Sequence, residues 1–177
     1  MVTGGAGSAG EDGAHSGNGA QSGDGRPAPV DLIRLGARLI LGIALLVAGV
    51  GHLTTQRTEF RAQVPSWFPV EPDLVVVVSG VVEILLGGAL ILAGRWAPQV
   101  GVLVAVFFVV IFPGNIAQYV ERRDAFGLDS DTTRLVRLAF QPVLILWALW
   151  SSGAWGWLRA RYRERRSIDD PGPSSTA

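Results

Sequence analysis

The sequence predicts an all-α, polytopic membrane protein in which four transmembrane helices form a bundle between disordered termini. The chain of 177 residues is 49% hydrophobic and only 17% charged, with a mean hydropathy of +0.34. It is too apolar for an ordinary soluble domain once its polar ends are set aside. Four apolar segments each approach the roughly 20 residues that a helix needs to cross a bilayer. None of them alternates apolar and polar residues as a strand would.

The two ends of the chain are predicted to be disordered. Residues 1–29 are rich in Gly, with Ser, Asp and Asn among them, and cannot bury a core. This segment has neither the basic start nor the apolar run of a signal peptide. Residues 159–177 carry a cluster of arginines and then the sequence SIDDPGPSSTA, which predicts a basic and then disordered cytoplasmic tail. The membrane domain is therefore assigned to residues 30–158.

The membrane domain divides into four expected crossings. Pro98 suits the first position of the third helix, and Ser130 or Asp131 can cap the fourth. The expected crossings lie near residues 32–53, 74–94, 98–120 and 132–153.

The third crossing contains an unusual polar stretch, FPGNIAQY, at residues 112–119. A helix from Pro98 that ended at Phe112 would span only about 22 Å, which is too short for a bilayer. We therefore expect the helix to continue through Pro113 to about Tyr119. Asn115 then lies inside the membrane, either as a hydrogen-bonding contact between helices or, with Gln118, as part of a polar cavity.

The distribution of arginines predicts the orientation, because all 15 basic residues are arginine. Four crossings place both termini on one side. That side carries nine arginines and the other side six, so the positive-inside rule favours cytoplasmic termini. Four tryptophans at positions 96, 150, 155 and 157 would then form an aromatic belt at the inner interface, and the basic tail would bind anionic headgroups.

Polar side chains within the apolar segments are predicted to gather in the outer half of the membrane. With this orientation they come from all four helices, and no comparable cluster lies in the inner half. A one-sided cluster favours an outward-facing pocket, because helix packing alone is needed at every depth. The candidate pocket residues are His52, Glu83, Asn115, Gln118, Arg137 and Gln141.

Glu83 gives the strongest single signal. An ionisable group near the middle of a membrane helix is costly to leave against lipid. Ser79, Gly80 and Gly87 share its helix face, and small residues mark the side on which helices approach closely. We therefore expect Glu83 to face the bundle interior, within hydrogen-bonding reach of His52 or Asn115. Two interpretations stay open: a carboxyl group that joins helices, and a group that binds a ligand or handles protons.

The first outer connection and the missing residue types narrow the function further. Residues 54–73 combine three prolines with Phe60, Trp67 and Phe68. This composition predicts a short amphipathic helix and then an extended stretch, which would serve as a lid over the polar cluster or as an interfacial anchor.

The chain has no cysteine, and its single histidine outside the tail is too few for a zinc or iron site. No catalytic motif or cofactor fingerprint is present, and the zero net charge gives no indication of nucleic acid binding.

Several short motifs together resemble the DoxX-like family of small bacterial membrane proteins. They are GVGHL (49–53), VPSWFPVEP (64–72), SGVVEILLGGALIL (79–92), RWAP (95–98) and FPGNIAQY (112–119). The resemblance covers residues 32–152 and implies a four-helix bundle in the bacterial plasma membrane. His52, Glu83 and Asn115 match polar positions of the family, which takes its name from a subunit associated with a terminal quinol oxidase.

Two classes of function follow from the sequence and the resemblance. One is a non-enzymatic subunit or assembly partner of a membrane complex of redox or respiratory type. The other is a binding or transport protein in which the Glu83 cluster holds a small polar molecule, a quinone headgroup or a proton. The lipid bilayer is the expected environment in both cases, and another membrane or redox protein is the expected partner in the first.

Overall fold

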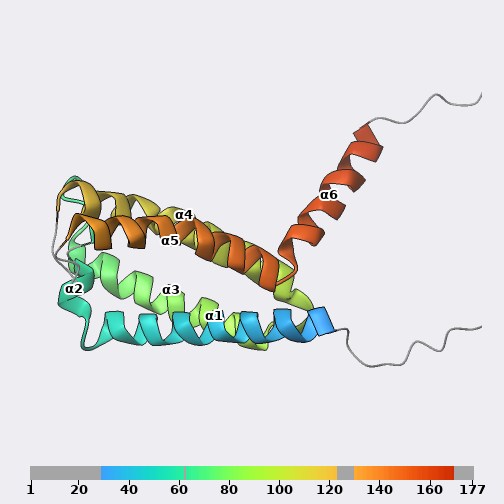
Figure 1. The fold of residues 1–177 in the computed structure, drawn as a ribbon, viewed down its shortest axis with the longest axis horizontal. Helices are drawn as coiled ribbons and strands as arrows, with labels where there is room; N and C mark the ends of the chain where they lie inside the picture. The colour runs from blue at the N-terminus through green and yellow to red at the C-terminus, as the bar shows by residue number, and fades with distance from the viewer. Residues whose placement is uncertain (1–28, 62, 123–129, 170–177) are drawn as a thin grey trace, which may run out of the picture.

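The computed structural model describes residues 29–61, 63–122 and 130–169, and this part of the chain contains helices and turns but no strand. Four long helices form the body of the molecule, and shorter elements connect or follow them (Figure 1). The elements are α1 (Pro29–Leu53), α2 (Arg57–Arg61), α3 (Pro72–Leu92), the 3-10 helix η1 (Gly94–Trp96), α4 (Ala97–Val120), α5 (Asp131–Ser151) and α6 (Ala154–Asp169).

The four expected apolar helices are confirmed, with bounds within a few residues of those predicted. α1, α3, α5 and the combined η1–α4 segment are each long and apolar enough to cross a membrane. Ser130 caps α5, since its side chain accepts a hydrogen bond from the Thr133 backbone N–H. α4 runs through Pro113 to Val120, as its length required.

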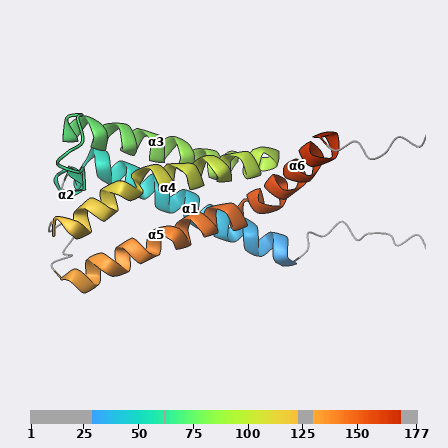
Figure 2. The ribbon, with the colours of Figure 1, turned by 90° about the horizontal axis from the view of Figure 1, so that it is seen from above.

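The four long helices run up and down the bundle in chain order (Figure 1). We call the end that carries α2 the loop end, and the end that carries α6 and the start of α1 the terminal end. α1 packs mainly on α3 and α4 packs mainly on α5, while contacts between the two pairs are sparser. Figure 2 shows the same arrangement from above, with α6 continuing beyond the terminal end. The bundle is therefore two helix pairs joined along a looser seam.

Glycines at matching heights let α1 and α3 approach closely. A Cβ atom at Gly49 would lie 2.6 Å from the carbonyl oxygen of Gly80, and one at Gly87 would lie 2.6 Å from that of Gly42. Both pairs are seven residues apart along their helices, so they recur on one face after two turns. Small residues at such crossings allow backbones to touch, as is typical of helix contacts in membranes.

Apolar side chains near the middle and terminal end of the bundle form its core. Leu90, Val104 and Ala148, from three different helices, are fully buried, and Leu41, Leu45 and Phe108 pack with them. Large apolar side chains also cover the outside: Val47 is 68% exposed and Leu85 is 66% exposed. An apolar surface of this extent suits contact with lipid or with other apolar helices rather than with water.

The C-terminal part differs from the sequence-based prediction. Residues Ala154–Asp169 form α6, so the predicted boundary between residues 158 and 159 falls inside a helix, and residues 167–169 are helical. Arginine is a good helix former, and Gly153, with φ of +75°, provides the turn that separates α6 from α5. Pro29 also belongs to α1. The disorder predicted for residues 1–28 and 170–177 lies outside the described residues.

Candidate binding site

His52 and Glu83 meet in the contact between α1 and α3. His52 lies in the last turn of α1 and is 5% exposed, while Glu83 on α3 is 6% exposed. The His52 Nδ1 atom lies 3.4 Å from Glu83 Oε2 and 3.1 Å from the hydroxyl oxygen of Ser79. The expectation that Glu83 faces the bundle interior, close to His52, is therefore confirmed.

Two polar atoms of this pair lack a hydrogen-bond partner. Among the described residues, neither His52 Nε2 nor Glu83 Oε2 has one, although both atoms are buried. Buried polar atoms are almost always hydrogen-bonded, so two such atoms without a hydrogen bond on one pair are unusual. Because an imidazole and a carboxyl lie side by side, the pair has the capacity both to donate and to accept hydrogen bonds.

The His52–Glu83 pair lies on the wall of a cavity of about 530 Å³ between α3 and α4. We call it the α3–α4 cavity. Its walls come from α3 between Leu74 and Glu83, from α4 between Phe107 and Gly114, and from the connection 63–70. Nearly all of these side chains are apolar, and His52, Ser79 and Glu83 form the polar patch. An apolar cavity with a few convergent polar groups is the usual form of a small-molecule site.

The cavity opens at the side of the bundle. Three of its lining residues, Leu74, Val78 and Val110, are 54%, 53% and 67% exposed on the outer flanks of α3 and α4. This opening follows the looser seam between the two helix pairs. The apolar part of the cavity is therefore open to the flank of the bundle, while His52 and Glu83 lie buried behind it.

The connection from α2 to α3 closes the loop end of the cavity. The Phe60 ring stands edge-on to the His52 ring, at an interplanar angle of 77°. A Cβ atom at Gly114 would lie 2.9 Å from the carbonyl oxygen of Gln63, so the connection rests directly on α4 where the helix lacks a side chain. The predicted short helix is α2, and Trp67 and Phe68 line the cavity.

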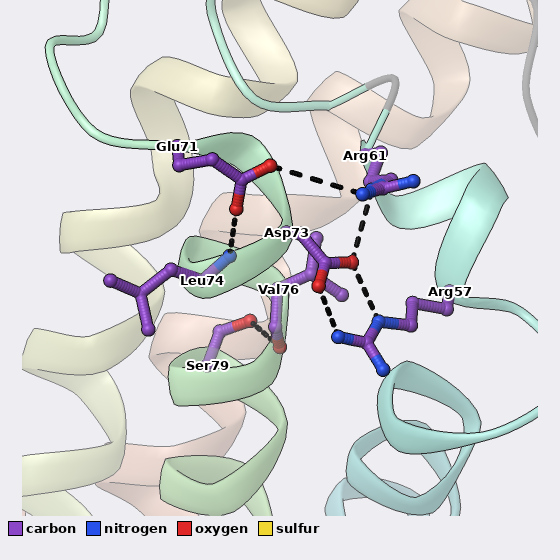
Figure 3. A network of polar contacts seen from close by, with 7 residues as sticks. All are labelled: Arg57, Arg61, Glu71, Asp73, Leu74, Val76 and Ser79. Atoms are coloured by element: carbon purple, nitrogen blue, oxygen red, sulfur yellow. Dashed lines mark hydrogen bonds and ion pairs between the residues drawn. The ribbon is translucent and has the colours of Figure 1, made fainter.

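An ionic latch holds this connection in place (Figure 3). Arg57 on α2 forms a bidentate pair with Asp73 at the start of α3, including an Nε–Oδ1 hydrogen bond of 2.6 Å. The Arg61 Nε atom lies 3.1 Å from Asp73 Oδ1, and the Arg61 Nη2 atom lies 3.8 Å from Glu71 Oε1. The hydrogen bond to Asp73 raises the pKa of the Arg57 guanidinium above its ordinary value. We call these four residues the α2–α3 latch; the sequence analysis did not identify them.

Two of the remaining candidate residues, Asn115 and Gln141, form a polar contact between α4 and α5. The Asn115 side-chain amide donates a hydrogen bond of 2.7 Å to Gln141 Oε1. Gln141 in turn donates one of 2.7 Å to the backbone carbonyl of Phe108. Gln118 is 2% exposed, and its Nε2 atom has no hydrogen-bond partner among the described residues. Arg137 is half-buried and lies within electrostatic range of His52.

The structure does not bring all six candidate pocket residues to the α3–α4 cavity. Of the six, only His52 and Glu83 line the α3–α4 cavity. Asn115 shares a face of α4 with Phe108 and turns towards α5, whereas Phe107, Ile111 and Gly114 face the cavity. Gln118 lies one turn beyond the cavity. Because the bundle is built from two pairs, polar groups that share one depth divide between two interfaces.

Within the described ranges, no three His, Asp or Glu side chains group as metal ligands.

The contribution of Ser79 to the polar patch was not predicted from the sequence, although this residue was placed on the same helix face as Glu83. The signal that could have found it is the i, i+4 spacing of two polar residues on an otherwise apolar helix.

Fold and site together define a class: an all-α bundle whose four long helices have the length and apolarity of membrane-crossing helices, with a buried polar pair on an apolar cavity. The chain belongs to the family described as "Domain of unknown function (DUF8561)", whose model matches residues 41–152. This range contains His52, Glu83 and every other residue that lines the α3–α4 cavity. Comparisons with curated proteins and with solved structures found no match.

Proposed function

We propose that α1, α3, α4 and α5 cross a bacterial plasma membrane, with both termini in the cytoplasm. The length and apolarity of the four helices support the crossing. The excess of arginines at the terminal end supports the orientation. The loop end, with α2 and the entrance of the cavity, then lies in the outer half of the membrane.

Reporter fusions test this topology. Fusions after residues 64, 95, 126 and 170 are expected to report outside, inside, outside and inside. An inside signal at 64 or 126 would overturn the orientation. The cavity and its polar pair would remain as described, but they would lie in the inner half.

We further propose that the α3–α4 cavity binds a small lipid-soluble molecule. The observation that carries this proposal is the pair of unpartnered buried atoms, His52 Nε2 and Glu83 Oε2, on the wall of an apolar cavity that opens at the flank of the bundle. The apolar body of the ligand would lie between α3 and α4, with its polar group against the pair. A quinone headgroup is one chemistry that fits. Proton handling by Glu83 is a related possibility that uses the same pair.

Mass spectrometry of the protein purified in mild detergent tests this proposal. The wild-type chain is expected to retain a bound lipid, quinone or other small molecule, and Glu83→Gln is expected to lose it. Leaving a buried polar group of the ligand without its partner costs about 1–3 kcal/mol, which corresponds to a loss of roughly 5- to 150-fold in affinity. Glu164→Gln makes the same chemical change on exposed α6 and should retain the ligand. Equal retention by both variants would exclude a role for Glu83 in binding.

A second candidate function is that of a non-enzymatic subunit or assembly partner of a redox or respiratory membrane complex. The resemblance to DoxX-like proteins motivates this proposal. The lateral opening favours it too, since a side chain from a partner helix could fill the cavity in place of a ligand. Stoichiometric co-purification of one membrane protein, lost in a variant with Val110→Trp at the opening, would support this function over ligand binding.

A further inference from the structure

α6 carries an exposed apolar stripe along one side. Trp155, Leu158 and Tyr162 follow one another at helical spacing and are 50%, 39% and 66% exposed. A shallow hollow runs along them, bordered by Arg159 and Arg163. We call these three residues the α6 stripe. An apolar stripe on an otherwise charged helix is typical of a helix that lies in the plane of a membrane interface. The apolar side then contacts the acyl chains and the charged side faces the headgroups and water.

Arginines flank the stripe and give α6 a strong positive charge. Arg159, Arg161, Arg163, Arg165 and Arg166 are all exposed. Glu164 is the only acidic group among the α6 side chains that the structure describes. The guanidinium of Arg159 lies 5.1 Å from the Trp155 ring, and that of Arg161 lies 4.8 Å from the Trp157 ring. These cation–π contacts hold positive charge beside aromatic rings.

α6 begins directly after an apolar helix ends. Only Ser152 and Gly153 separate it from α5, and the positive φ of Gly153 allows the chain to change direction there. Trp150 and Trp96, at the same end of the bundle, are 44% and 56% exposed. If α5 crosses the membrane, this end lies at the headgroup level, where tryptophan is enriched.

We propose that α6 docks through its stripe on the surface of an anionic bilayer, with the flanking arginines bound to acidic headgroups. The charge of α6 is complementary to such a surface, and the stripe continues the tryptophan belt at the terminal end. This inference rests on the proposed crossing by α5 but not on the α3–α4 cavity. Failure of ligand binding therefore leaves it intact, and its own failure leaves ligand binding intact.

Single spin labels test the docking, because the chain has no cysteine of its own. Leu158→Cys places a label on the stripe, and Ala160→Cys places one on the opposite, exposed side of the same helix. Both variants are reconstituted into vesicles of phosphatidylcholine alone and into a three-to-one mixture of phosphatidylcholine and phosphatidylglycerol. Exposure of each label to a water-soluble nickel chelate, relative to oxygen, is then measured by electron paramagnetic resonance.

The label at Leu158 is expected to be protected from nickel several-fold more in the phosphatidylglycerol vesicles, while the label at Ala160 stays accessible in both. Each arginine contributes about a fivefold factor to binding of an anionic surface. Replacing Arg159, Arg163 and Arg166 with Gln should therefore weaken docking by roughly 100-fold and expose the Leu158 label.

Three results would overturn the proposal. Equal protection in phosphatidylcholine alone would show that acidic headgroups are not required. Low exposure of the Leu158 label to both nickel and oxygen would show that the stripe packs on protein. Full exposure of the Leu158 label in phosphatidylglycerol vesicles would show that α6 does not dock.

Discussion

Gly80 on α3 lies against His52 on α1 so closely that a Cβ atom at Gly80 would lie 2.7 Å from the Cβ atom of His52. The missing side chain at position 80 is what lets the imidazole lie over α3, where Ser79 and Glu83 meet it. Helix packing and site geometry thus depend on the same residue.

Gly80→Ala is therefore expected to disturb both stability and binding. Overpacking of a close contact costs about 1–3 kcal/mol, so the melting temperature in detergent should fall, and ligand retention should fall with it as His52 moves.

Gly88→Ala on the same helix is the control. No heavy atom lies within 4 Å of its added Cβ, and alanine is a better helix former by about 1 kcal/mol, so this variant should be as stable as the wild type or more so. Equal melting temperatures for the two variants would contradict the packing described for Gly80.

The His52–Glu83 contact should appear as an energetic coupling. A double-mutant cycle of His52→Gln and Glu83→Gln is expected to give a coupling of about 0.5–3 kcal/mol in unfolding, which is usual for contacting polar groups. The combination of His52→Gln with Gln141→Leu serves as the reference. These residues belong to separate contacts, so the changes that the two substitutions cause in the free energy of unfolding should add within about 0.5 kcal/mol. A coupling near zero for the first pair would show that the two side chains do not interact.

The Asn115–Gln141 contact should prove structural. Gln141→Leu removes the partner of Asn115, and leaving a buried amide unsatisfied costs about 1–3 kcal/mol. We expect a lower melting temperature with unchanged ligand retention, because neither residue lines the cavity. Asn115→Ala should behave in the same way. Loss of ligand at full stability in either variant would return these residues to the binding site and revive the larger pocket.

The α2–α3 latch should control access to the loop end of the cavity. Val64 belongs to the connection and is 6% exposed, so a single cysteine introduced by Val64→Cys should react slowly with a water-soluble maleimide. Adding Asp73→Asn removes the shared carboxylate of Arg57 and Arg61 and is expected to speed labelling a few-fold. High salt should speed labelling of the Val64→Cys protein that retains Asp73, because salt screens exposed ion pairs. It should have less effect on the labelling rate of the protein that also carries Asp73→Asn. Identical rates with and without Asp73 would show that the latch does not hold the connection closed.

The sequence by itself determined the four helices and much of their individual character. Hydropathy and length set their existence, Ser130 marked the start of α5, and the bilayer-length argument carried α4 through Pro113. The burial of Glu83 also followed from the sequence, because Ser79, Gly80 and Gly87 identify one face of α3 as the packed one. All of these are properties of one helix at a time, which the local order of residues is sufficient to specify.

Only the tertiary structure decided which polar groups share a site. Rotation of each helix about its axis and the pairing of α1 with α3 and α4 with α5 depend on many side chains acting together. The glycine contacts at Gly49 and Gly80 draw α1 onto α3, which places His52 on Glu83. The Asn115–Gln141 bond joins α4 to α5 instead. Depth in the bundle, which the sequence does indicate, brings all six polar residues to one level, but helix pairing divides that level into a cavity wall and a separate interhelical contact.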